Sequence, residues 1–216
     1  MTIEISAFTW VPPFAEGHVR DLRVRWALEE AGLPYEAVLI DHDGKNTPEY
    51  RAWQPFGQVP AYRDGEVELF ESGAIVLHLA NRSEALAPAD AAGRARVATW
   101  VLCALNTLEP DFAALAELDL FHPGEAWTAE RRPQLEQAVR RRLGELAAAL
   151  GDRPYLEGRF TAGDILMTTV LRLVEPAMLA EFPPLAAYRE RNEARPAFAR
   201  ALEAQLRPFR DNAPAA

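Results

Sequence analysis

Apolar positions recur with a period of two at the start of the chain and with a period near 3.6 over most of the rest. The alternating, β-branched stretch Thr2 to Thr9 predicts a first strand, which stops at Val11-Pro12-Pro13. Helical spacing then predicts a helix from about Val19 to Ala31, with Gly32 placed to end it. A second strand is expected from Tyr35 to Ile40. Strand, helix and strand over this length predict a right-handed βαβ unit with parallel strands.

A hairpin and another helix follow. Val59 to Tyr62 and Val67 to Phe70 are strand formers joined by a turn that contains Asp64-Gly65, a strong hairpin signal. A short segment from Thr47 to Trp53 precedes them, and Ser72 stands where the N-cap of a helix to Asn81 would stand. The first part of the chain therefore has the predicted order β-α-β-α-β-β-α.

Strand signals end near Arg82, so we expect one α/β domain over residues 1–82, a linker over 83–90 and an all-helical domain over 91–216. Long helices are predicted from Ala92 to Leu118, with a bend or break at Pro110, and from Thr128 to Leu150.

The end of the chain carries a helix-start signature and two short helices. Thr161 and Asp164 have the spacing of a capping box, and Phe160 and Ile165 have that of a hydrophobic staple. The short helices are expected over roughly 184–195 and 196–206, each opened by proline.

The composition of the chain indicates what kinds of molecule it binds and in what setting it folds. The chain has 216 residues, 49% of them hydrophobic, which is enough for a sizeable core. A net charge of −9 argues against nucleic acid or an anionic membrane as the main partner. Cys103 is the only cysteine, no apolar run approaches membrane length, and no secretory signal is recognised, so we expect a reducing, cytoplasmic setting.

Two short motifs carry the candidate chemistry. Val59-Pro60 marks a strand entrance where proline leaves backbone groups open for an extended ligand to pair with. Ser72 opens a helix one hairpin later, and a hydroxyl beside the unpaired N–H groups of a helix start attracts a carboxylate. Each motif alone is more often an ordinary turn or cap, but their order and spacing favour a shared site.

Gln58-Val59-Pro60 followed by Glu71-Ser72 resembles the glutathione site of the soluble glutathione transferases. The resemblance is to a bacterial-type member of no assigned class, with a thioredoxin-like α/β N-terminal domain and an all-α C-terminal domain. It implies that the Val59 backbone, before a cis Pro60, pairs with the cysteinyl part of glutathione. It also implies that Glu71 and Ser72 hold the γ-glutamyl end, and that Gln58 contacts the glycine carboxylate.

Lys45 lies in the loop that the resemblance places facing this site, although a lone loop lysine is more often simply solvated. It is the only lysine in the chain.

The chain departs from the family pattern at the group that activates the thiol. No Ser, Tyr or Cys lies between Thr9 and Trp26, and the family's serine and cysteine positions fall on His18 and Arg20. A guanidinium near a helix start would hold a thiolate by charge, so we hypothesise that Arg20 stabilises it, with His18 and Trp10 as neighbours. The alternative, an ordinary surface ion pair of Arg20, is about as well supported.

Three functions compete on this sequence. The first is conjugation of the glutathione thiolate to a small hydrophobic electrophile, with glutathione as co-substrate and no metal. The others are a glutathione-dependent disulfide reductase and a non-catalytic glutathione- or partner-binding protein. The resemblance implies a homodimer. We expect the electrophile pocket between the two domains, formed by the long first loop and the first C-terminal helix. The candidate residues for that pocket are Trp100, Asn106, Phe112 and Phe121.

Overall fold

The computed structural model describes residues 2–214 of the chain. The chain folds into two compact units: the first contains the residues up to Ala89 together with those from Arg195 onward, and the second spans Asp90–Ala194. Each unit has its own core and is described by itself.

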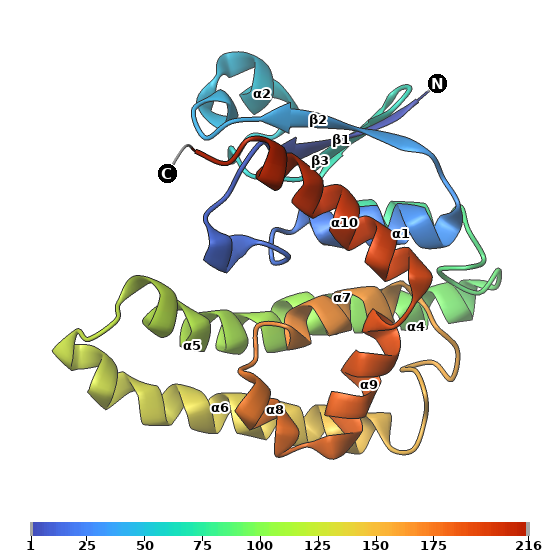
Figure 1. Ribbon diagram of the computed structural model, residues 1–216. Coiled ribbons are helices and arrows are strands. Elements are labelled where there is room, and N and C mark those ends of the chain that lie inside the picture. Colours follow the sequence, from blue (N-terminus) through green and yellow to red (C-terminus); the bar gives the residue numbers. More distant parts are fainter. Residues whose placement is uncertain (1, 215–216) are drawn as a thin grey trace. The chain divides into compact units, whose positions relative to one another are not determined.

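A four-stranded mixed sheet is the centre of the first unit, with strand order β2-β1-β3-β4 (Figure 1). Strands β1 (Ile3–Phe8) and β2 (Tyr35–Ile40) are parallel, whereas β3 (Ala61–Asp64) runs antiparallel to both β1 and β4 (Val67–Phe70). The sequence expectation of a thioredoxin-like α/β domain is confirmed.

Helices connect and cover these strands. Helix α1 (Asp21–Ala31) makes the crossover between β1 and β2, α2 (Pro48–Trp53) precedes β3, and α3 (Ser72–Ala80) follows β4. Two short 3-10 turns, Pro13–Ala15 and Gly44–Asn46, lie in the loops after β1 and β2. The side chains that bury themselves between the sheet and α1 and α3 include Ile5, Leu22, Val24, Leu28, Tyr62, Ile75, Val76 and Leu79.

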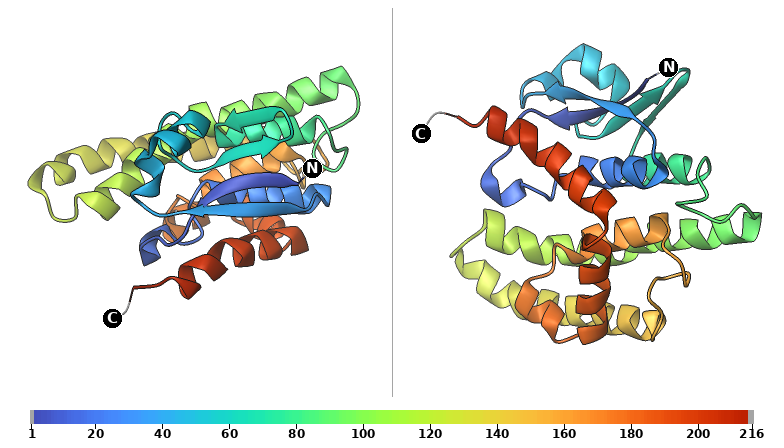
Figure 2. Two further views of the ribbon diagram at one scale, coloured as in Figure 1. Left: turned by 90° about the horizontal axis from the view of Figure 1, so that it is seen from above. Right: turned by 45° about the vertical axis from the view of Figure 1, so that its right-hand side comes forward.

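Helix α1 is covered on more than one side. All eight residues from Asp21 to Leu28 are buried, and such a helix needs a cover besides the sheet and α3. Helix α10 (Pro196–Asp211) supplies it, packing along α1 in both views of Figure 2. The Phe198 ring meets the Trp26 ring edge-on at 4.8 Å between centroids.

The position of α10 differs from the predicted domain boundary, which put residues 91–216 in one helical domain. Arg195 Nε donates to Glu30 Oε1 at 2.6 Å, and Gln205 Nε2 donates to the Val19 carbonyl at 3.1 Å. Ion pairing and packing to α1 therefore group the last helix with the sheet. The helical periodicity of this segment gave no sign of which unit its apolar face covers.

The second unit is entirely helical across its described residues. It comprises α4 (Ala91–Leu102), a π-helical segment (Cys103–Leu108), α5 (Glu109–Phe121), α6 (Ala126–Leu150), α7 (Ala162–Leu171), α8 (Pro176–Ala180) and α9 (Pro183–Glu193). The short helix α8 was not predicted.

Pro110 does not break the first long helix of this unit. It occupies the first turn of α5, directly after the π-helical segment. A proline has no N–H to continue the α-helical ladder, and the widened π turn accommodates that loss while the chain direction is kept. The predicted break is thus a change of helix type.

The capping box at the start of α7 is present as predicted. Asp164 is fully buried, and its Oδ2 accepts hydrogen bonds from the backbone N–H of Thr161 at 2.8 Å and from the Thr161 hydroxyl at 3.1 Å. Its Oδ1 accepts from the Leu156 N–H at 3.0 Å and from the Tyr188 hydroxyl at 2.8 Å. Burial raises the pKa of Asp164, and these four bonds act in the opposite direction.

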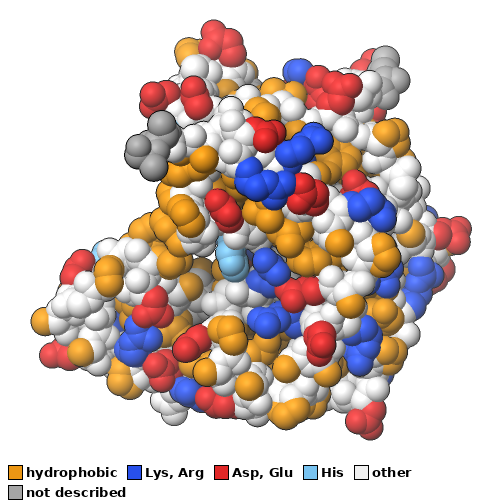
Figure 3. Space-filling view, in the orientation of Figure 1, with side chains coloured by type: hydrophobic (Ala, Val, Ile, Leu, Met, Phe, Trp, Pro, Cys, Tyr) orange, Lys and Arg blue, Asp and Glu red, His pale blue; other side chains and the backbone are white. Residues whose placement is uncertain are grey.

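Two surface properties complete the description. No helix among residues 2–214 combines the length and the apolar character needed to cross a membrane. On the face drawn in Figure 3, basic and acidic side chains are interspersed, and no continuous basic surface forms.

Candidate functional site

One edge of the sheet gathers the segments that the sequence singled out. Ile5 lies opposite Tyr62 and Ala61 opposite Phe70, so β1 and β4 end where β3 begins. Strand β2 is parallel to β1 and ends at the same edge. The loops that carry the predicted residues therefore leave the sheet side by side. They contain Trp10, Lys45, Gln58, Val59, Pro60, Glu71 and Ser72.

The Val59-Pro60 peptide bond is cis, and both residues are buried. Buried side chains hold the backbone on either side of it. The Ala61 N–H donates to Ser6 Oγ at 2.7 Å, Ser6 Oγ lies 2.7 Å from the Tyr50 hydroxyl, and that hydroxyl donates to the Gln58 carbonyl at 2.5 Å.

The donor of each hydrogen bond in this series follows from the groups at its two ends, an N–H and a carbonyl oxygen. A carbonyl oxygen only accepts, so the Tyr50 hydroxyl must donate its hydrogen bond to the Gln58 carbonyl. The Ser6 hydroxyl must therefore donate to the Tyr50 oxygen. Burial raises the pKa of Tyr50, which keeps its hydroxyl protonated for this role. We call Ser6 and Tyr50 the buried clamp, because together they fix the backbone before and after Val59-Pro60.

Sequence reasoning missed the buried clamp. Ser6 is 0% exposed in the structure. The one sequence signal that could have flagged it is a polar residue in the middle of an apolar strand. Tyr50 lies in a short helix whose pattern did not set it apart from a packed aromatic residue.

The loop before Gln58 is also tightly specified. Gln54 is buried, and its side-chain Oε1 accepts from the Phe56 N–H at 2.7 Å while its carbonyl accepts from the Gly57 N–H at 3.0 Å. Gly57 has φ of +62°, and a Cβ there would lie 2.7 Å from the Arg51 guanidinium. The positive φ therefore favours glycine at this turn, and a larger residue would also have to displace the Arg51 guanidinium.

The start of α3 corrects the predicted cap. Glu71 is the N-cap and Ser72 is the first helical residue, because the chain turns at Glu71, which has φ of 69° and ψ of 114°. A non-glycine residue in this conformation is strained, and such strain concentrates at ligand-binding turns. Ser72 is buried, and Arg23 Nη1 donates to its Oγ at 3.3 Å.

Arg23 adds positive charge beneath this helix start. It comes from α1 and is 5% exposed. Together with the N–H groups that open a helix, a guanidinium here creates a local preference for a carboxylate on an otherwise acidic protein. Arg23 was not among the residues predicted for the site. An arginine among the apolar residues of α1 was the available signal.

The predicted thiol-activating residues lie in the loop between β1 and α1. Trp10 is half-buried, whereas His18 and Arg20 are exposed. Arg20 is the N-cap residue of α1, and the His18 N–H donates to the Ala15 carbonyl at 3.0 Å. The fold brings this loop to the same edge as Val59, in agreement with the predicted placement; the roles of the three side chains stay predictions.

The remaining predicted residues are more peripheral. Lys45 lies in the 3-10 turn after β2, with its Nζ 3.3 Å from His42 Nε2, and Gln58 is exposed. Among residues 2–214, no group of three or more His, Cys, Asp or Glu side chains is arranged to hold a metal ion.

The predicted electrophile-pocket residues differ in exposure within the second unit. Phe112 is 1% exposed and belongs to the core, while Phe121 is 61% exposed and Asn106 is on the surface. Trp100 Nε1 donates to Glu157 Oε1 at 3.0 Å.

A thioredoxin-like unit with an open cis-proline strand end and a helix start at the same sheet edge, followed by a helical unit, defines the class of thiol-binding transferase folds. Residues 15–81 match the family described as "Glutathione S-transferase, N-terminal domain". Glutathione S-transferase 3 of Zea mays is 32% identical over 197 residues, which cover 85% of this chain and 88% of the maize protein. The chain belongs to the glutathione S-transferase family.

Solved structures agree with this assignment. A glutathione transferase from Burkholderia graminis, with two glutathione molecules bound per subunit, is 29% identical and has a TM-score of 0.82, covering 94% of this chain and 88% of that one. A theta class glutathione S-transferase from Xanthomonas axonopodis pv. citri with glutathione bound is 31% identical, with a TM-score of 0.77 and coverage of 93% and 97%.

Proposed function

We propose that this protein is a glutathione transferase that joins the sulfur of glutathione to a small hydrophobic electrophile. The observation that carries the proposal is the buried clamp, which fixes the backbone around Val59-Pro60 at the sheet edge where α3 begins. An extended thiol peptide needs a preformed backbone edge to pair with, and this fold builds one.

In the proposed complex, the Val59 backbone pairs with the cysteinyl residue. Glu71, the Ser72 hydroxyl and the first N–H groups of α3 hold the γ-glutamyl end, and Arg23 adds charge from beneath. Gln58 and Lys45 contact the glycine carboxylate. These contacts place the sulfur toward the loop between β1 and α1.

The chemical step requires a thiolate. Arg20, with His18 and Trp10 as neighbours, stabilises the sulfur anion, and the thiol proton leaves to solvent. The thiolate forms a C–S bond with the electrophilic carbon while a halide or similar leaving group departs with its bonding electrons. With an activated double bond, the π electrons move to the activating group instead, and the anion that results takes a proton from solvent.

A disulfide reductase is the second candidate. The Burkholderia graminis relative binds two glutathione molecules per subunit, and the structure of a relative from Pseudomonas fluorescens, which is 27% identical, has two glutathione bound. In that reaction one bound thiolate attacks a disulfide sulfur and releases the first substrate thiolate. The thiolate of the second glutathione then attacks the mixed disulfide, which forms glutathione disulfide and releases the second substrate thiolate. The protein needs no cysteine of its own for this exchange.

Ser72→Ala tests the shared binding site of both reactions. The substitution removes a charge-assisted hydrogen bond to the γ-glutamyl carboxylate, so we expect the affinity for glutathione, measured by calorimetry, to fall about tenfold. Ser83→Ala, outside the site, is the matched control and leaves binding unchanged. Unchanged affinity in Ser72→Ala contradicts the proposed site.

Two assays then separate the candidate reactions. Turnover of 1-chloro-2,4-dinitrobenzene supports the transferase, and turnover of hydroxyethyl disulfide supports the reductase. Binding of glutathione with neither activity would identify a non-catalytic binding protein.

We also propose the homodimer and the cytoplasmic setting that the family implies. Phe56 is 63% exposed, and its ring lies 5.9 Å from that of Phe70, so the two form an apolar surface on the first unit. Analytical ultracentrifugation of the wild type and of Phe56→Ser tests the dimer. We expect the Phe56→Ser dimer to be weaker, so that it dissociates into monomers at a higher protein concentration than the wild type does.

A further inference from the structure

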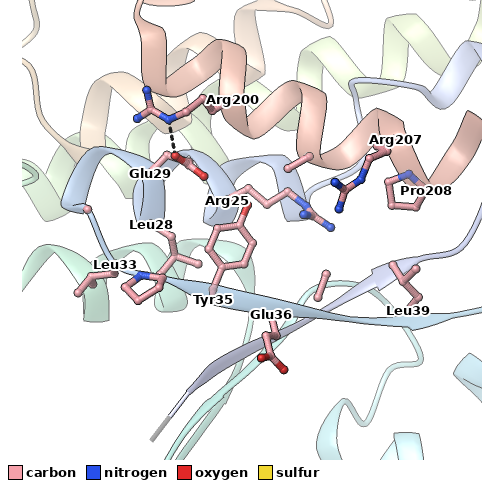
Figure 4. Close-up of a pocket in the computed structure, with 14 residues that line it drawn as sticks. Arg25, Leu28, Glu29, Leu33, Tyr35, Glu36, Leu39, Arg200, Arg207 and Pro208 are labelled. Carbon is pink, nitrogen blue, oxygen red and sulfur yellow. Dashed lines mark hydrogen bonds and ion pairs between the residues drawn. The ribbon is translucent and has the colours of Figure 1, made fainter.

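The last helix, α10, is attached to α1 near both ends of α1. Near the C-terminal end, Arg195 pairs with Glu30 at 2.6 Å. Arg200 pairs with Glu29 at the same distance, and this pair is drawn in Figure 4, where α10 runs beside α1. Near the N-terminal end, the contact is made by Gln205, which is 1% exposed. The C-terminal end of α1 is thus held by ion pairs and the N-terminal end by a buried amide.

The Gln205 amide binds two acceptors where α1 begins. Its Nε2 donates to the Val19 carbonyl at 3.1 Å and to Asp21 Oδ1 at 2.5 Å. A carbonyl and a carboxylate only accept, so the amide has to turn its nitrogen toward them. One side chain from α10 therefore holds the backbone on both sides of Arg20.

Both acceptors are also held by α1 itself. Asp21 is fully buried, and Arg25 Nε donates to its other carboxylate oxygen, Oδ2, at 2.7 Å. The Val19 carbonyl also accepts from the Leu22 N–H at 3.1 Å. The position of the first turn of α1 is therefore shared between the helix and Gln205, and without the amide each acceptor keeps only its partner within α1.

Packing alone does not favour glutamine at this position. The other buried residues of α10 are all apolar, namely Ala197, Phe198, Ala201 and Phe209, and Gln205 lies among them at helical spacing. Its Oε1 has no hydrogen-bond partner among residues 2–214, so burial of this amide has a cost that an apolar side chain of the same length would avoid. The contribution of Gln205 must therefore come from its two hydrogen bonds.

We propose that Gln205 is a positioning residue for thiol activation. It holds the backbone from Val19 to Asp21, and through it sets where Arg20 and the N–H groups before α1 lie relative to the glutathione sulfur. Donors stabilise an anion most when they are fixed before it forms. This inference rests on the proposed binding of glutathione at Val59. It holds whether the activating group is the Arg20 side chain or a backbone N–H, because Gln205 positions both.

Gln205→Met tests the proposal, because methionine keeps the length of the side chain but has no N–H to donate. Thiolate absorbance of glutathione bound to the full-length protein is followed against pH. We expect the pKa of the bound thiol to rise by about half a unit, so that the thiolate fraction below this pKa falls about threefold. The affinity for S-methylglutathione, which has no thiol to ionise, should be unchanged, because the buried clamp still holds the Val59 edge.

Phe198→Leu is the matched control for a merely structural role. Phe198 belongs to the same buried face of α10 and packs on Trp26, which lies further along α1 than the residues that Gln205 holds. The smaller side chain should lower the melting temperature by about 3 °C. It should leave the pKa of the bound thiol unchanged.

Amide hydrogen exchange without glutathione measures the positioning directly. The Leu22 N–H donates to the Val19 carbonyl, which Gln205 also binds. In Gln205→Met this amide should exchange about tenfold faster, because the turn opens more readily. In Phe198→Leu its exchange should match that of the wild type.

The possible results separate this proposal from the proposed function. If the wild type lowers the thiol pKa of bound glutathione and Gln205→Met lowers it equally, the positioning role is overturned while glutathione binding stands. The same conclusion follows if Phe198→Leu raises the thiol pKa as much as Gln205→Met, or if the Leu22 exchange is equal in Gln205→Met and wild type. If the wild type does not lower the thiol pKa, the proposed activation and the positioning role are both overturned.

Discussion

The two sides of the candidate glutathione site are built in different ways. On the side of Val59 and Ser72, the ligand-facing backbone is held by side chains that are themselves buried, namely Ser6, Tyr50 and Arg23. On the side of the loop between β1 and α1, the predicted charged groups His18 and Arg20 are exposed, and Trp10 is half-buried. The proposed binding side is thus built from within the fold, and the proposed thiol-activating side from its surface.

This difference separates the expected effects of substitutions. Removing a buried hydrogen-bond partner leaves another polar group unsatisfied, at a cost of about 1 to 3 kcal/mol to stability or to the geometry that binds ligand. Truncating an exposed side chain costs little stability, so its effect falls on the chemistry that the side chain serves. Substitutions on the side of Val59 and Ser72 should therefore change the affinity for glutathione, and substitutions in the loop between β1 and α1 should change the pKa of the bound thiol.

The largest effect is expected for Tyr50→Phe. The change removes the donor to the Gln58 carbonyl and the acceptor for Ser6, so the backbone before Val59 loses its fixed position. We expect glutathione affinity to fall about tenfold or more and the melting temperature to fall by about 5 °C. Calorimetric titration and a thermal scan measure the two quantities.

A double-mutant cycle sharpens this prediction. Ser6→Ala should reproduce most of the loss, and the combined variant should be little worse than Tyr50→Phe alone, because the two residues act as one clamp. Tyr155→Phe, in the second unit, should bind glutathione like the wild type. Additive losses in the double variant would show that the clamp does not act as a unit.

The same difference explains what the sequence could and could not predict. The element order, the Val59-Pro60 strand end and the Thr161 capping box follow from local patterns of turn, cap and periodicity, and these are confirmed. The clamp joins Ser6 to Tyr50 across 44 positions, and Gln205 reaches Asp21 across 184. No local pattern records such contacts, because they depend on how the elements pack.

A smaller but more specific effect is expected for Arg20→Ala. If its guanidinium stabilises the thiolate, its loss should raise the pKa of the bound glutathione thiol by about one unit, which corresponds to about 1.4 kcal/mol. Thiolate absorbance against pH measures this shift, and affinity should change little. His18→Ala should give a smaller rise.

Arg131→Ala, an exposed arginine of the second unit, is the matched control for general charge effects. If the thiol pKa is the same in wild type, Arg20→Ala and His18→Ala, activation comes from another group, such as a backbone N–H of this loop. In that case both sides of the site would act through the backbone, and exposed side chains would not account for thiol activation.

The smallest effect is expected for Lys45→Ala, at the edge of the binding side. Lys45 is partly exposed and lies beside His42, so water screens its attraction to the glycine carboxylate, and KM for glutathione should rise only two- to threefold, or about 0.5 kcal/mol. Glutathione monoethyl ester, which lacks the charge on the glycine carboxylate, gives the decisive contrast. The wild type should bind this ester about as weakly as Lys45→Ala binds glutathione, and the variant should not distinguish the two ligands. A variant that still prefers free glutathione by the wild-type ratio would place the glycine end away from this loop.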